Sequence, residues 1–190
     1  MLNPDVKIVK FDFGTFIPNA WTLYVMLLNN RERLAPWFWW ANEKVTANFC
    51  KTLLFGTSYI IEVKRRKISR LLFHKKSYDE QFLIFSGAKL TGMIGLDDID
   101  TAHKEAEIWC FITPESEGKG IASASFKILA DYAFDAKGLD CIYARTAAGN
   151  DKSEAFLRQN NFQIAKIEYG VPISSRNPKI TDLTTWEYSR

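Results

Sequence analysis

Apolar and polar positions follow the most regular pattern in the second half of the chain. Residues 105–113 and 139–146 are short apolar runs of the kind found in buried strands. Between them, apolar residues recur at helical spacing from Lys119 to Lys137, and Gly138 follows where helices commonly end. A further helix is expected after Asn150. This order predicts a βαβα core within a mixed α/β sheet.

The other segments carry weaker versions of the same patterns. Pro18 precedes one helical run and Pro36 stops it, because proline cannot continue a helix. The expected elements are a strand at 6–13, helices at 20–33 and 43–55, a hairpin turning at 86–89, and closing strands at 162–171 and 182–189.

One segment of the first half is strongly basic. The run from Lys64 to Lys76 holds seven lysines or arginines and no acid, with Ile68, Leu71 and Leu72 at helical spacing. It predicts a basic amphipathic helix inside a basic insertion at 57–80. Such a helix is either a solvated face or a docking surface for an acidic partner, such as ribosomal RNA.

Composition limits the class of protein. The chain has 190 residues, of which 47% are apolar, so we expect a single domain over 1–190. A net charge of +3 does not by itself imply a nucleic-acid partner. The three cysteines lack metal or disulfide spacing, and no run approaches the roughly 18 uncharged residues of a membrane helix. We therefore expect a cytoplasmic protein that contacts no membrane and binds no metal.

A glycine-rich turn opens the helix that begins near Lys119. Gly118 and Gly120 have no side chains, so the backbone is accessible at a point where several N–H groups lack acceptors within the helix. The helix dipole is positive there, so the turn suits an anion such as a phosphate. A tight turn that needs glycine for its shape alone explains the same residues. Neither a Walker A nor a Rossmann pattern is present.

The sequence around this turn resembles the GNAT acyl-CoA N-acyltransferases. Their phosphate motif has Gln or Arg, two residues, Gly, one residue, then Gly or Ala, and the corresponding stretch is Glu117 to Ala122. Their Asn-x-x-Ser pattern corresponds to Asn150 to Ser153, before a helix that ends at Asn161-Phe162. The segments LAPWFWW and TTWEYS resemble the RimL-like branch of ribosomal-protein N-terminal acetyltransferases. The resemblance implies a mostly antiparallel mixed sheet flanked by helices, with the acetyl-CoA-binding core at 105–162.

The resemblance also implies the cofactor contacts. Acetyl-CoA is the expected co-substrate, and a strand that splays from its neighbour is expected to hold the pantetheine arm. The implied cofactor-binding residues are Phe111, Ile112 and Thr113 for the arm, Gly118, Lys119, Gly120, Ile121 and Ala122 for the pyrophosphate, and Asn150. A backbone N–H near Phe111 is expected to stabilise the thioester oxyanion. Glu117 departs from the motif, which predicts weaker binding and leaves a noncatalytic CoA-binding or RNA-associating protein open.

Two residues are the candidates for proton transfer. The amine must lose a proton before attack, and Glu107 is the first candidate base, with Glu105 on the same strand face and Glu168 as weaker alternatives. The tyrosine that many members use to protonate the leaving thiolate is replaced by Leu157, so Ser153 becomes the candidate acid. Glu107 as a rim carboxylate and Ser153 as a polar first-turn residue are the alternative interpretations.

The acceptor is not fixed by the sequence. A protein N-terminal amine is the leading hypothesis, and a small amine such as a polyamine or an antibiotic is the second. Trp37, Trp39 and Trp40 could wall an acceptor pocket or belong to the core. His74 and His103 have no metal-ligand spacing, and Cys110 is interpreted as a small hydrophobic residue. The oligomeric state is left open, a homodimer included.

Overall fold

The computed structural model describes residues 5–11, 13–38, 41, 80–174 and 177–190. The strands are β1 (Val6–Lys10), β2 (Glu80–Ser86), β3 (Lys89–Asp100), β4 (Glu105–Ile112), β5 (Cys141–Ala147), β6 (Gln163–Ser174) and β7 (Asn177–Ser189). The helices are α1 (Phe13–Leu34), the short 3-10 helix η2 (Pro114–Ser116), α3 (Ile121–Asp131), the π-helical turn η3 (Tyr132–Ala136) and α4 (Asp151–Gln159).

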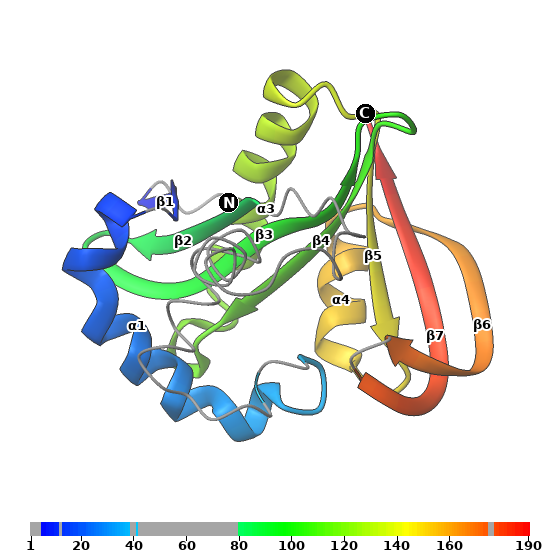
Figure 1. Cartoon of the computed structure of the whole chain (residues 1–190), viewed down its shortest axis with the longest axis horizontal. Helices are drawn as coiled ribbons and strands as arrows, with labels where there is room; N and C mark the ends of the chain where they lie inside the picture. The colour runs from blue at the N-terminus through cyan, green and yellow to red at the C-terminus, as the bar shows by residue number, and fades with distance from the viewer. Residues whose placement is uncertain (1–4, 12, 39–40, 42–79, 175–176) are drawn as a thin grey trace, which may run out of the picture.

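The described strands form one seven-stranded sheet in the order β1-β2-β3-β4-β5-β7-β6. Every neighbouring pair is antiparallel except β4 and β5, which are parallel. The predicted mixed, mostly antiparallel sheet is confirmed, and α3 is the crossover helix of its single parallel pair. Figure 1 shows that β4 and β5 meet near one end and diverge along their length.

Helices cover both faces of the sheet. On one face, Leu23 and Leu27 of α1 pack in a cluster with Leu83, Met93 and Phe111 of the central strands. On the other face, α3 and α4 pack against the alternate residues of the same strands. That larger core includes Ile84, Ile94, Ile108, Phe126, Leu129, Leu157 and Trp186. Alternation of side chains along β2, β3 and β4 therefore separates an α1 layer from an α3/α4 layer.

The N-terminal elements differ from their predicted bounds. The first strand ends at Lys10, and α1 begins at Phe13, well before the predicted start at Ala20. Pro18 lies inside this helix and does not form its boundary. Leu23 and Leu27 are fully buried farther along α1, so tertiary packing favours the helix despite the backbone bond that proline cannot make.

The second half agrees closely with its pattern. The predicted helix at 119–137 is confirmed as α3 followed by η3, where the chain widens into a π-helical turn. Gly138 follows with φ +67°, the left-handed conformation expected of a residue that ends a helix. The two predicted closing strands are longer than expected, because β6 extends to Ser174 and β7 begins at Asn177.

Several expectations lie outside the described residues. They are the helix at 43–55, the insertion at 57–80 up to residue 79, the basic run at 64–76, Trp39, Trp40 and His74.

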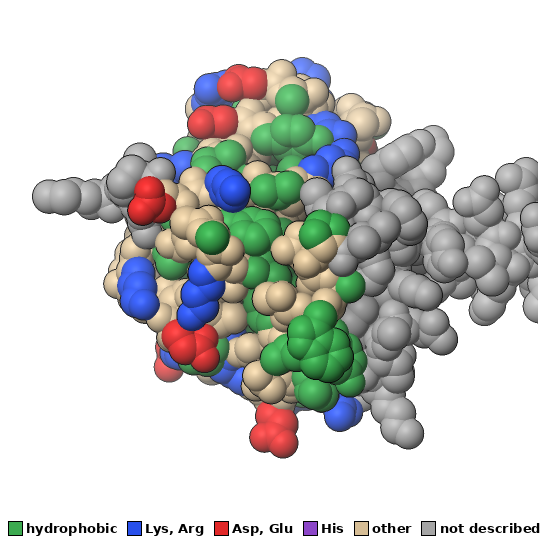
Figure 2. Space-filling view, turned by 90° about the vertical axis from the view of Figure 1, so that its left-hand side faces the viewer, with side chains coloured by type: hydrophobic (Ala, Val, Ile, Leu, Met, Phe, Trp, Pro, Cys, Tyr) green, Lys and Arg blue, Asp and Glu red, His purple; other side chains and the backbone are tan. Residues whose placement is uncertain are grey.

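On the face that carries β1 and the start of α1, Figure 2 shows acidic, basic and hydrophobic side chains interspersed. No helix in the described part of the chain is both long and apolar enough to cross a bilayer.

Candidate active site

The turn before α3 has the geometry of an anion cradle. Gly118 and Gly120 both have φ +72°, a conformation that side chains disfavour, and Gly120 is the N-cap without any side-chain cap. The first hydrogen bond of the helix runs from Ala124 N to Gly120 O at 3.0 Å. Backbone N–H groups earlier than Ala124 therefore have no acceptor within the helix. A side chain at Gly118 would meet open space, so a ligand can approach this backbone.

Among the described strands, β4 pairs with β5 only at its start, and the remaining edge, called here the open edge of β4, leads up to the turn. The pairing of β4 with β5 covers Glu105 to Glu107 and stops at the Glu107–Tyr143 pair. The rest of β4 continues to Ile112 along its β3 partner, a distance of roughly 16 Å at strand spacing. Backbone groups on such an edge can pair with an extended ligand that carries amides. The edge thus runs from Glu107 at one end to the α3 turn at the other.

The three residues implied for the pantetheine arm lie at the far end of this edge. Phe111 and Ile112 are buried. The backbone of β3 lies so close to them that a Cβ added at Gly92 would be 2.2 Å from the Phe111 carbonyl oxygen. Thr113 N donates to Thr91 O at 2.8 Å, and its hydroxyl contacts Ser116. This end of β4 is therefore fixed before any ligand arrives.

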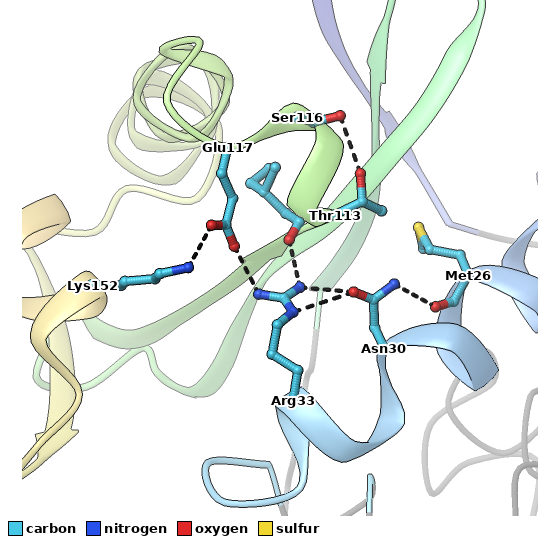
Figure 3. A network of polar contacts seen from close by, with 8 residues as sticks. Met26, Asn30, Arg33, Thr113, Ser116, Glu117 and Lys152 are labelled. Carbon is cyan, nitrogen blue, oxygen red and sulfur yellow. Dashed lines mark hydrogen bonds and ion pairs between the residues drawn. The ribbon is translucent and has the colours of Figure 1, made fainter.

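Glu117 lies between two cations. Its carboxylate accepts from Arg33 Nη1 at 2.9 Å and from Lys152 Nζ at 2.6 Å (Figure 3). Arg33 also donates to the carbonyl oxygen of Ile112 at 2.7 Å. These contacts bring together the end of β4, the residues before the α3 turn and the first turn of α4. The negative charge of Glu117, next to the turn expected to hold phosphate, is compensated by these two partners.

Lys119 is turned back toward its own loop. Its ammonium donates to the Glu115 carbonyl oxygen at 2.6 Å, and the side chain is exposed. The predicted contact between Lys119 and phosphate requires this hydrogen bond to break. Ile121, by contrast, is buried in the larger core and anchors the turn, and Ala122 packs against the same core.

Glu107 is paired with Arg145 of β5. Arg145 Nε donates to Oε1 at 3.0 Å, and Nη2 contacts Oε2. This hydrogen bond raises the pKa of Arg145 above its usual value, so the guanidinium stays charged. Tyr143 lies in register with Glu107, and burial, with the nearby Glu107 charge, raises its pKa to about 12. Glu107 therefore lies where the open edge begins, beside a charged guanidinium and a neutral phenol.

Asn150 and Ser153 lie at the start of α4. Asn150 is the N-cap residue of α4, but its side chain makes no hydrogen bond to the first turn. Helix capping therefore does not explain why an asparagine occupies this position. Ser153 is half-buried and one helical turn before Leu157, which is 3% exposed in the larger core. The position where many family members have tyrosine is thus a packing position in this chain, and Ser153 is on the same side of the helix.

Aromatic residues line the α1 face beside Glu107. Trp109 Nε1 donates to Asp97 at 3.0 Å, and the indole crosses Gly95, where a Cβ would lie 2.7 Å from the ring. Phe38 contacts Trp109 and Phe111 edge-on, with ring centroids 6.3 and 6.4 Å away. Trp37, the described member of the predicted tryptophan group, is half-buried.

The remaining candidates lie apart from this arrangement. Glu168 is on β6, which β5 and β7 separate from β4, and it pairs with Lys166 at 2.9 Å. His103 is exposed and pairs with Asp100. Burial raises the pKa of the Cys110 thiol to about 12, which agrees with its interpretation as a hydrophobic residue. No cluster of potential metal ligands occurs among the residues that the structure describes.

Residues 26–163 match the model of the acetyltransferase (GNAT) domain. The chain belongs to this family. It is an acetyl-CoA-dependent N-acetyltransferase, as the open edge of β4 and the α3 turn suggest, and the noncatalytic alternative is set aside.

Two sequence relatives and one structure illustrate the relationship. The acetyltransferase is 32% identical over 144 residues to the Bacillus subtilis (strain 168) protein named "Putative ribosomal N-acetyltransferase YdaF", covering 76% of this chain and 72% of that one. It is 28% identical over 96 residues to spermidine N(1)-acetyltransferase of Escherichia coli (strain K12), covering 49% and 52%. The structure of RimL, the ribosomal L7/L12 α-N-protein acetyltransferase in complex with coenzyme A, superposes with TM-score 0.78. It covers 100% of this chain and 96% of that one at 16% identity, which shows the shared fold.

Sequence reasoning missed three charged residues of the site. Arg33, Arg145 and Lys152 are ordinary members of helices or strands by their local pattern. Of the three, Arg145 was the most predictable from the sequence. It lies on the same face as Tyr143 of a strand that was expected beside the strand of Glu107. Arg33 had none, because its contact with Glu117 spans 84 positions of the chain.

Proposed function

We propose that this acetyltransferase modifies a protein N-terminal amine. The observation that carries the proposal is the match to the ribosomal N-acetyltransferase relative, which extends over about three quarters of this chain. The matches to spermidine acetyltransferases extend over about half of it. The first match is thus the longer one, with 144 residues against 96.

The cofactor residues have distinct parts in this proposal. Acetyl-CoA supplies an activated acetyl thioester. N–H groups from Gly118 to Ala122 bind its pyrophosphate at the positive end of α3. The edge of β4, with Phe111, Ile112 and Thr113, aligns the extended arm, and the Asn150 side chain is the α4 contact. The amine is then held where its nitrogen meets the thioester carbon.

Two residues manage the protons. Glu107 accepts the proton that the ammonium form of the amine must lose before its nitrogen attacks the thioester carbon. As the C–S bond breaks, Ser153 donates a proton to the departing sulfur, and the second proton of the nitrogen returns to Ser153 through solvent. Arg145 does not prevent the first role, because a carboxylate offers about four lone-pair sites and the guanidinium takes two of them. Glu107 keeps its place through the ion pair while it exchanges a proton on its other side.

The same ion pair favours a peptide over a polyamine. A polyamine carries several positive charges, and its recognition calls for acids that lack a positive partner. Both oxygens of Glu107 contact Arg145, so the carboxylate of Glu107 at the start of the open edge is already compensated. A peptide N-terminus brings a single charge, which is lost before the reaction.

Acetylation of a small amine is the second candidate function. It is favoured by relatives from Escherichia coli and Vibrio cholerae that are named spermidine N(1)-acetyltransferases and are 28% and 33% identical over about half of this chain. These matches are shorter than the match to the ribosomal N-acetyltransferase relative, which covers 76% of this chain. An acceptor comparison between peptide and polyamine separates the two functions.

We further propose that the basic run at 64–76 docks on ribosomal RNA in the cytoplasm. Seven like charges suit a polyanion, and lysines bind phosphates without sequence preference. The test replaces Lys64, Arg65, Arg66 and Lys67 with alanine. We expect strong loss of ribosome cosedimentation at low salt, while activity on a short peptide is unchanged. Equal cosedimentation of variant and parent contradicts the docking.

A further inference from the structure

Glu117 connects elements from the two layers of the protein. Arg33 comes from the last turn of α1, on one face of the sheet, and Lys152 from the first turn of α4, on the other. Figure 3 shows both side chains reaching the Glu117 carboxylate from different sides. The cluster carries two positive charges and one negative charge immediately before the turn that suits an anion.

The two cations are held very differently. Arg33 donates to Asn30 Oδ1 at 3.0 Å and to the Ile112 carbonyl as well as to Glu117. Asn30 is 5% exposed and is itself fixed by a 2.8 Å hydrogen bond to the Met26 carbonyl. Arg33 is therefore preorganised and loses little freedom by holding Glu117.

Lys152 has a much looser position. Its side chain is 76% exposed, and Glu117 is its ion-pair partner at 2.6 Å. Exposed ion pairs of this kind contribute little to stability, so a stronger anion can replace Glu117 as the partner of Lys152. A pyrophosphate at the adjacent turn is such an anion, because it carries more than one negative charge.

Arg33 also determines where the Glu117 charge lies. It holds the carboxylate on the α1 side, and through Ile112 it holds the end of β4 where the edge for the arm finishes. Without Arg33, the carboxylate is free to turn toward the phosphate site, where like charges repel. Through these two contacts Arg33 can influence a cofactor bound at the turn without touching it.

We infer that Lys152 is a phosphate-binding residue that exchanges Glu117 for the cofactor pyrophosphate, and that Arg33 is a positioning residue that keeps Glu117 and β4 in place. The inference rests on acetyl-CoA as co-substrate and is independent of the acceptor. It gives a role to Glu117, the residue that departs from the phosphate motif: Glu117 is the partner of Lys152 until the pyrophosphate binds. The departure then weakens binding less than its charge alone suggests.

The test compares two ligands by calorimetry, CoA and pantetheine, which lacks the pyrophosphate. Lys152→Met is expected to weaken CoA about tenfold and to leave pantetheine unchanged. Lys166→Met is the matched control, because Lys166 is also exposed and paired with one glutamate, but on the distant strand β6. The control is expected to leave both affinities unchanged.

Glu117→Gln tests the exchange from the other side. The amide still accepts a hydrogen bond from Arg33 but no longer competes for Lys152, so CoA is expected to bind about threefold to tenfold tighter. The gain is expected to shrink when Lys152 is already methionine. Equal CoA affinities in parent, Lys152→Met and Glu117→Gln contradict the exchange, as does a Lys152→Met loss that is equal for pantetheine.

Arg33→Met tests the positioning role. We expect weaker binding of both ligands, with part of the CoA affinity restored in the Arg33→Met/Glu117→Gln double variant. A double variant no better than Arg33→Met contradicts the role assigned to Arg33. If the methionine variant does not fold, Arg33→Lys keeps the charge without the planar fork and is compared in the same way. Failure to acetylate a given acceptor leaves these binding results unaffected.

Discussion

Arg145 donates to both carboxylate oxygens of Glu107 across the only parallel strand pair that the described residues form. The pair lies where β5 stops pairing with β4. It fixes the candidate base at the start of the open edge, and the Arg145 charge persists because Glu107 raises its pKa. The Glu107 carboxylate is thus held in a fixed position, whereas a carboxylate that only faces solvent at the rim would not need such a partner.

Glu107→Gln separates positioning from proton transfer. The amide retains an oxygen for Arg145 but cannot take the proton from the amine. We expect kcat to fall about 10²-fold, with acetyl-CoA affinity nearly unchanged. Steady-state kinetics and calorimetry measure the two effects. Glu105→Gln, on the same strand face, is the control, and a Glu107→Gln enzyme with parental kcat rules out the base.

Ser153→Ala removes the proposed proton donor at the start of α4. We expect kcat to fall by about tenfold or more, because the sulfur then departs without a positioned proton. The high-pH side of the pH–rate profile is expected to change while binding of acetyl-CoA does not. Profiles identical to the parent in both Ser153→Ala and Glu107→Gln mean that water and orientation carry the reaction.

Gly120→Asp tests the anion cradle. The change adds a negative charge and a side chain at a residue with φ +72°, so acetyl-CoA binding is expected to weaken at least about tenfold, or roughly 1.4 kcal/mol. Gly138→Asp is the matched control. It places the same side chain at φ +67° beyond the other end of the helix. Both variants are expected to lose stability, but only Gly120→Asp is expected to lose affinity by calorimetry.

The glycines and the buried strands were predictable from the sequence because they depend on local chemistry. Gly138 must adopt a left-handed conformation wherever the helix ends, and 105–113 is apolar enough to be central in any sheet. The point at which β4 leaves β5 was not predictable, because it depends on strand pairing. The compensation of Glu117 was equally hidden, because Arg33 is 84 positions away and Lys152 is 35. Pro18 misled the prediction because distant packing outweighs one missing hydrogen bond.

Glu80 links stability to pH. Burial acts to raise the pKa of Glu80, but hydrogen bonds and charges from Lys10 and Lys137 outweigh it, so the pKa lies below 4.5. A depressed pKa in the folded state gives stability that is present above the unfolded value and is lost as pH falls through the folded pKa.

Glu80→Gln is therefore expected to lower the free energy of unfolding by about 1–3 kcal/mol at pH 7. The difference from the parent should shrink below pH 4.5, as measured by denaturant unfolding at several pH values. Glu154→Gln, which breaks an i,i+4 pair with Arg158, is the control and is expected to cost less than about 0.5 kcal/mol. A Glu80→Gln effect that is the same at pH 3 and pH 7 contradicts the linkage.

The identity of the acceptor is tested most directly by the release of free CoA thiol when acetyl-CoA is offered with a peptide N-terminus, with spermidine, and with both together. Mass spectrometry of the peptide locates the acetyl group on the α-amine or on a lysine. We predict faster thiol release with the peptide, α-amine modification, and little inhibition by spermidine. Faster release with spermidine, which then outcompetes every peptide tested, contradicts the proposal and makes the small amine the substrate.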